Sequence, residues 1–114
     1  MRLIRILILL ALIGCLFGCA EAVPPEKSAY VGEWTQPKQG MYLLITQDGS
    51  VRYERLKSGA TVSLDGPLKG FDGDNFEVGI GLLAKTFVVS KPPYQEGDQW
   101  KMVVDEVELV KVED

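Results

Sequence analysis

The chain has 114 residues, a formal net charge of −4, two cysteines and no histidine. An acidic balance argues against nucleic-acid binding, which needs a basic patch. The lack of histidine excludes Ser-His and Cys-His nucleophile pairs and, with so few cysteines, Cys/His zinc sites. We therefore expect one small domain that is not an enzyme, has no catalytic residues, and carries no cofactor or metal.

The first segment of the chain is strongly apolar. Arg2 and Arg5 precede an uncharged run from residue 6 to residue 17, which is the order of charges and apolar residues in a secretory signal peptide. A helix that crosses the hydrocarbon core needs about 20 apolar residues, and this run is shorter. A cleaved signal peptide is therefore favoured over a permanent transmembrane helix.

Two cysteines stand at the end of this run. Residues 16–19 (LFGC) and 12–15 (LIGC) each resemble the lipobox of bacterial lipoproteins, where a small residue precedes a lipid-modified cysteine. Cleavage before Cys19 removes the whole apolar segment, so Cys19 is the predicted lipidation site and Cys15 the alternative. The resemblance implies a helical signal peptide over 1–18 and a lipidated cysteine with a flexible tether over 19–29. Such a tether could lift the domain up to about 25 Å from the membrane.

The same resemblance implies a location. A lipidated Cys19 would place the chain on the periplasmic face of a bacterial envelope membrane, held by covalent lipid. Ala20 follows the cysteine where aspartate is the usual inner-membrane retention signal, so the outer membrane is preferred. Without Arg2 and Arg5 the net charge becomes −6, so the domain is not expected to adhere to anionic headgroups. An envelope protein is the other partner we expect.

From Tyr30 onward the sequence consists of short runs of alternating apolar residues separated by glycine, proline and aspartate. This pattern is typical of antiparallel strands. Tight turns are predicted at residues 48–49, 58–59 and 105–106, and a loop at 65–75. The domain over 30–114 is therefore expected to be all-β, an antiparallel meander that closes into a barrel or half-barrel to hide its edges. The eight predicted strands are 31–35, 41–47, 51–57, 60–64, 76–80, 83–90, 99–104 and 107–112.

A Gly-x-Trp triplet at residues 32–34, followed by the hairpin at 48–53, is similar to the opening of lipocalin-like and other calycin-type barrels. The resemblance implies that Trp34 plugs the floor of the barrel. Trp34, Phe76 and Phe87 would either fill the core or line a ligand cavity. Strands as short as these favour a barrel that is filled by its own side chains.

Residues 91–94 (KPPY) are predicted to form an exposed loop after the sixth strand. Pro92 and Pro93 would stiffen it, and Tyr94 at its tip would contact a partner or fold back over the barrel. Residues 72–75 (DGDN) begin like a calcium loop but lack its later glycine and glutamate, so they are expected to be a polar turn. The remaining carboxylates show no spacing that pairs two of them at one site.

These observations favour a lipid-anchored envelope lipoprotein that acts as a non-enzymatic binding or assembly module. A lipocalin-like carrier of a small apolar ligand is one alternative. An inhibitor of a cell-wall hydrolase is the other, because Ser58-Gly59 is similar to the Ser-Gly loop of small barrel lipoproteins that inhibit lysozyme.

Overall fold

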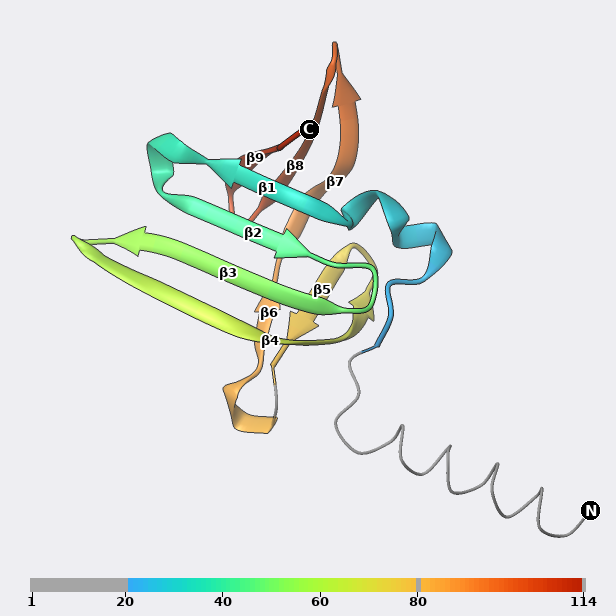
Figure 1. Cartoon of the computed structure of the whole chain (residues 1–114), viewed down its shortest axis with the longest axis vertical. Helices are drawn as coiled ribbons and strands as arrows, with labels where there is room; N and C mark the ends of the chain where they lie inside the picture. Colours follow the sequence, from blue (N-terminus) through green and yellow to red (C-terminus); the bar gives the residue numbers. More distant parts are fainter. Residues whose placement is uncertain (1–20, 80, 114) are drawn as a thin grey trace, which may run out of the picture.

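The computed structural model describes residues 21–79 and 81–113 (Figure 1). In this part of the chain nine antiparallel strands form one curled sheet, in the order β6-β5-β4-β3-β2-β1-β9-β8-β7. The prediction of an all-β half-barrel is confirmed, with nine strands where eight were expected. The strands are β1 (Gly32–Gln36), β2 (Met41–Ile45), β3 (Ser50–Lys57), β4 (Ala60–Asp72), β5 (Asn75–Val78), β6 (Lys85–Phe87), β7 (Val89–Glu96), β8 (Gln99–Val104) and β9 (Val107–Lys111). Three short 3-10 turns accompany them: η1 (Pro25–Tyr30), η2 (Pro37–Gln39) and η3 (Gly81–Leu83).

The tight turns lie where the sequence predicts them. Asp105 and Glu106 join β8 to β9 with φ angles of 48° and 67°, the left-handed pair that a two-residue hairpin turn requires. Ser58 and Gly59 join β3 to β4 in the same way, with φ angles of 51° and 79°. These turns set the register of their hairpins, so that apolar residues of successive strands share the concave face.

Strand β4 is longer than expected, because it continues as far as Asp72, well into the stretch 65–75 that was predicted to be a loop. Its first part pairs with β3 as far as Pro67, and from Leu68 onward it pairs with β5. The register shifts between Leu68 and Gly70, whose φ is 154°. The glycines and proline here mark a bulge where one strand passes from one neighbour to the next.

The predicted strand 83–90 is divided. Leu83 is the last residue of η3. Strand β6 then pairs with β5 at one edge of the sheet. After Val88 the chain continues as β7, which pairs with β8 at the other edge. Two hydrogen bonds tie this crossing to the β8–β9 turn. The Asp105 amide donates to the Val88 carbonyl at 2.8 Å, and the Val88 amide donates to Asp105 Oδ1 at 3.0 Å. One extended segment therefore brings both sheet edges together and curls the sheet.

The prediction that residues 91–94, with Pro92 and Pro93, form a loop after a strand is wrong. Strand β7 runs through both prolines to Glu96, with register shifts between residues 89 and 91 and between 91 and 94. Because β7 is an edge strand, a residue without an amide hydrogen is tolerated on its free side. The prolines and bulges also hinder pairing with a strand of another molecule.

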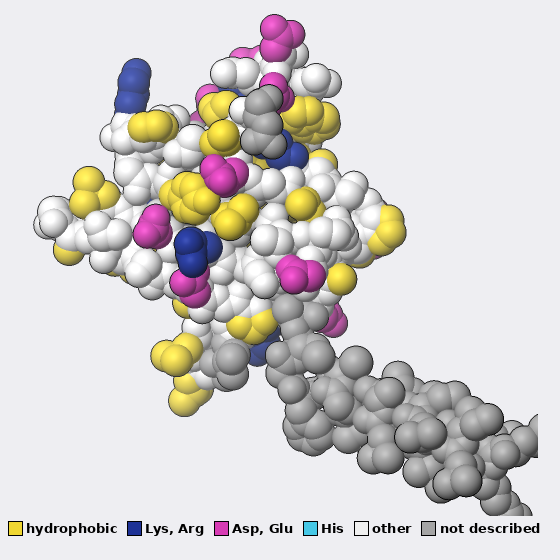
Figure 2. Space-filling view, in the orientation of Figure 1, with side chains coloured by type: hydrophobic (Ala, Val, Ile, Leu, Met, Phe, Trp, Pro, Cys, Tyr) yellow, Lys and Arg dark blue, Asp and Glu magenta, His cyan; other side chains and the backbone are white. Residues whose placement is uncertain are grey.

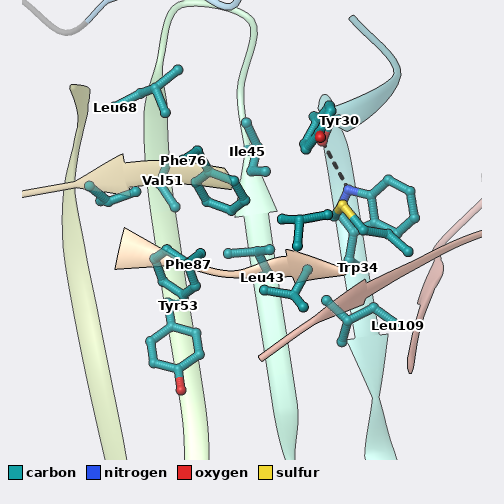
Figure 3. Packing of buried hydrophobic residues seen from close by; sticks show 14 of the residues in the cluster. Tyr30, Trp34, Leu43, Ile45, Val51, Tyr53, Leu68, Phe76, Phe87 and Leu109 are labelled. Atoms are coloured by element: carbon teal, nitrogen blue, oxygen red, sulfur yellow. Dashed lines mark hydrogen bonds between the residues drawn. The ribbon is translucent and has the colours of Figure 1, made fainter. Parts of the chain in front are cut away.

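The core lies on the concave face of the sheet (Figure 3). Alternate residues of β2 point into it, so Met41, Leu43 and Ile45 are buried. The Phe76 and Phe87 rings stack with centroids 4.9 Å apart. Aromatic pairs of this kind add about 0.5–1.5 kcal/mol beyond the area that they bury.

Candidate functional site

The two cysteines of the lipobox-like sequences, Cys15 and Cys19, lie outside the described residues. The described chain begins at Glu21, two positions after Cys19. The Glu21 amide already donates a hydrogen bond to the Leu68 carbonyl of β4, at 3.0 Å. The point at which the N-terminal segment joins the sheet is therefore fixed close to the predicted lipidation site.

The next residues continue this attachment. Val23 is buried, and its amide donates to the Gln47 carbonyl at 3.0 Å while Gln47 Nε2 donates to the Val23 carbonyl at 2.9 Å. The chain then forms η1, which ends at the buried Tyr30. The expected flexible tether over 19–29 thus differs from what the structure describes, because residues 21–30 lie against the sheet.

The η1 turn is fastened to the β4–β5 turn by two side chains. The Tyr30 hydroxyl donates to the Asp74 carbonyl at 2.9 Å, and Lys27 Nζ donates to the Gly73 carbonyl at 2.8 Å. Lys27 Nζ also lies 5.4 Å from the centroid of the Phe71 ring. The turn that begins like a calcium loop therefore gives two backbone carbonyls to η1. Within the described ranges no cluster of histidine, cysteine, aspartate or glutamate could hold a metal ion.

Burial of Tyr30, with a smaller effect of the Asp74 carboxylate, raises its pKa to about 12 from 10.0. The unfolded chain therefore loses this proton at a lower pH than the folded protein does. We expect the free energy of unfolding to be unaffected by this group below pH 10.0 and to fall between pH 10.0 and about 12. Screening by nearby water limits the loss to the order of 1 kcal/mol.

Replacing Tyr30 with phenylalanine should remove this alkaline decline. It should also cost about 1 kcal/mol at neutral pH, because the hydrogen bond to Asp74 is lost. Urea denaturation at a series of pH values measures both effects. Tyr94→Phe on β7 is the matched control and should keep the decline. A decline in Tyr30→Phe as steep as that of the parent protein would contradict this assignment.

The three aromatic residues predicted as core plug or cavity lining are all in the core. Trp34 and Phe87 are 0% exposed and Phe76 is 1% exposed. The Trp34 indole donates its Nε1 hydrogen to the Tyr30 carbonyl at 2.9 Å (Figure 3). Phe76 borders a surface groove of about 320 Å³ beside Phe71.

Lys111 was not among the candidate site residues predicted from the sequence. Its Nζ lies 5.1 Å from the Trp34 ring centroid and 5.9 Å from that of Trp100, and it donates to the Ala29 carbonyl at 3.3 Å. Burial lowers the pKa of its ammonium group. A Cβ on Gly32 would lie 2.6 Å from Lys111 Cε, so the glycine of the Gly-x-Trp triplet leaves room for this lysine. Alternate residues of β9 face the core, and Lys111 belongs to this inward-facing set. That alternation is the sequence signal that could have identified Lys111.

The residues predicted for partner contact do not form a loop tip. Pro92 is exposed, whereas Pro93 and Tyr94 are half-buried on the edge strand β7. Lys91 Nζ lies 5.8 Å from the Tyr94 ring centroid. The tip of this hairpin is formed instead by the turn between Glu96 and Gln99. Contact with a partner through 92–94 stays a prediction, now for a strand edge.

Carboxylates elsewhere are used in structural contacts. Glu77 pairs with Lys69 at 3.3 Å, and Asp105 pairs with Lys85 at 3.0 Å. Ser58 lies in the exposed turn between β3 and β4. Glu77 and Asp105 are therefore each held in an ion pair with a lysine.

Neither protein-family models nor curated proteins nor solved structures match this chain. The half-barrel is the part of the sequence-based expectation that the structure confirms. Over the residues that the structure describes, no helix has the length and apolar character needed to cross a membrane.

Proposed function

We propose that this protein is a lipid-anchored lipoprotein of the bacterial envelope, whose half-barrel is a non-enzymatic binding or assembly module on the periplasmic face, preferably of the outer membrane. The observation that carries the proposal is the lipobox-like sequence that ends at Cys19, and the attachment of residues 21–30 to the sheet says how such an anchor would hold the domain. A lipid on Cys19 would be separated from the hydrogen-bonded Glu21 by at most about 7 Å. Acyl chains at that position hold the domain directly against the headgroups.

The packing of the core supports binding through the outer surface. Tyr53 and Phe87 meet edge to face at 5.0 Å, and Phe87 stacks on Phe76. These aromatic side chains contact one another, so a carrier function would need the core to open. On the convex face a groove of about 500 Å³ lies beside Leu44 and the Arg52–Asp65 ion pair. Figure 2 shows apolar side chains on this face between single charges of both signs, a surface suited to a protein partner.

Lipid attachment is tested by replacing each cysteine in the full chain. We expect Cys19→Ser to abolish incorporation of an alkyne-tagged fatty acid and to release the domain from the membrane fraction. Cys15→Ser is the matched control and should keep both the tag and the membrane location, because it leaves the cleavage position intact. Loss of the tag in Cys15→Ser but not in Cys19→Ser would overturn the site assignment.

A further inference from the structure

The η3 turn exposes two neighbouring leucines. Leu82 is 104% exposed and Leu83 is 80% exposed, the highest values among the large hydrophobic residues of the described chain. No charged residue occurs between Gly79 and Ala84. Single exposed apolar side chains are ordinary, but an uncharged turn that projects two adjacent leucines is a feature of surfaces that contact apolar partners or membranes.

The turn leaves the sheet beside the point where the N-terminal segment joins it. Glu21 donates to the Leu68 carbonyl, and Leu68 is the cross-strand partner of Val78, the last residue of β5. The Gly79 amide, at the start of the turn, donates to the Pro67 carbonyl at 2.9 Å. In Figure 1 this projection lies in the lower part of the view, where the described chain also begins, and Figure 2 shows hydrophobic side chains on it.

The backbone of this segment fixes the exposure of the leucines. Gly79 has a φ of +122°, and a Cβ there would lie 2.6 Å from the Leu83 carbonyl oxygen and 2.8 Å from the Ala84 Cα. The chain therefore folds back on itself so closely that only glycine fits. Leu83 stands where this tight fold closes and Leu82 directly precedes it, and both side chains point away from the sheet into solvent.

We propose that Leu82 and Leu83 insert into the bilayer surface beside the lipid on Cys19, as a second, non-covalent contact that sets the orientation of the domain. The inference rests on the membrane attachment proposed above. The covalent chain limits the distance from Cys19 to Glu21 to about 7 Å and that from Leu82 to Val78 to about 13 Å. Because Glu21 bonds to Leu68 and Leu68 pairs with Val78, a lipid on Cys19 and the two leucines would extend from neighbouring points of the sheet. Because the domain is acidic, apolar insertion is the non-covalent contact that it can make with a membrane.

The test uses the mature lipidated protein in phosphatidylcholine vesicles, some of whose acyl chains are brominated. The Leu82→Cys variant is labelled with a thiol-reactive, environment-sensitive fluorophore. The fluorophore reacts only at position 82, because in the lipidated protein the Cys19 thiol is blocked by lipid. Leu56→Cys is the matched control, because Leu56 is a leucine 52% exposed on β3. Leu56 pairs with Thr61, which lies seven positions along β4 from Leu68. Position 56 is therefore about 23 Å from Leu68, where the N-terminal segment joins the sheet. We expect blue-shifted emission and quenching at position 82 and neither at position 56.

Every outcome of this experiment decides the proposal. Absence of quenching at position 82 overturns insertion, while the separate Cys19→Ser experiment decides the lipid anchor. Equal quenching at positions 82 and 56 also overturns it, because the domain would then lie without a preferred end toward the membrane. A blue shift at position 82 without quenching by bromine identifies a protein, or a second copy of this chain, as the occupant and likewise overturns the proposal.

A second variant separates insertion from mere proximity. Leu83→Asp, combined with the label at position 82, places a charge in the inserted turn and should abolish the quenching. The fluorescence of the buried Trp34 should stay unchanged, since Leu83 is exposed and outside the core. Quenching that persists in Leu83→Asp, with the fold intact, would overturn insertion of the turn.

Discussion

Replacing Trp34 with alanine should lower the free energy of unfolding by about 3–5 kcal/mol. The side chain is fully buried, so the substitution leaves a cavity that the surrounding strands can close only in part. It also leaves the Tyr30 carbonyl without the indole donor and removes one of the two rings that face the Lys111 ammonium. A small domain has only about 5–15 kcal/mol in total, so urea denaturation should show a markedly earlier transition.

Two matched variants identify the cause of this loss. Trp100→Ala removes the other ring beside Lys111, but Trp100 is only half-buried, so the expected loss is less than half that of Trp34→Ala. Trp34→Phe keeps an aromatic ring and lacks the N–H donor, and it should fall between the two. Equal losses for both alanine variants would show that Trp34 is not the centre of the core.

Local alternation was sufficient to predict most of the sheet. In β2 the buried residues Met41, Leu43 and Ile45 alternate with partly exposed ones, and this period follows directly from strand geometry. The turn at 105–106 was predictable because two acidic residues interrupt the apolar alternation, and Asp105 is of a residue type that accepts the left-handed backbone of a two-residue hairpin. Such features depend on neighbours in the sequence alone.

Features that depend on distant neighbours were not predictable. The glycines of residues 65–72 indicate a loop, yet β4 continues there because β5 supplies a new partner strand. Pro92 and Pro93 indicate the end of a strand, and only the position of β7 at the sheet edge makes them compatible with it. Leu83 was assigned to the predicted strand 83–90 and Leu82 lay just before it, yet both belong to the exposed turn η3. In each case sheet order, rather than composition, decides the structure.

The attachment of the N-terminal segment is the least predictable of these features. Val23 stands between alanine and two prolines, a composition typical of a flexible linker. Its burial depends on Gln47, which lies in the connection between β2 and β3 and forms hydrogen bonds with it. A single valine thus decides whether residues 21–30 belong to the tether or to the domain.

Replacing Val23 with aspartate should therefore have a large and specific effect. A carboxylate at a site only 3% exposed has no charged partner, so we expect a loss of roughly 2–4 kcal/mol or release of residues 21–30 from the sheet. Val62→Asp is the matched control, because Val62 is 49% exposed and should change the free energy of unfolding by no more than about 0.5 kcal/mol. Urea denaturation measures the loss, and hydrogen exchange of the Glu21 and Val23 amides measures the release.

The same substitution tests whether the attachment of residues 21–30 sets the position of the domain at the membrane. Once released, ten residues could extend to about 30 Å, so the domain would no longer be held against the headgroups. We then expect the label at position 82 to lose its quenching although the lipid on Cys19 is still attached. If Val23→Asp changes neither stability nor amide exchange, the segment is not part of the folded domain. Quenching at position 82 that survives release of the segment would mean that the two leucines bind the bilayer without help from the N-terminal attachment.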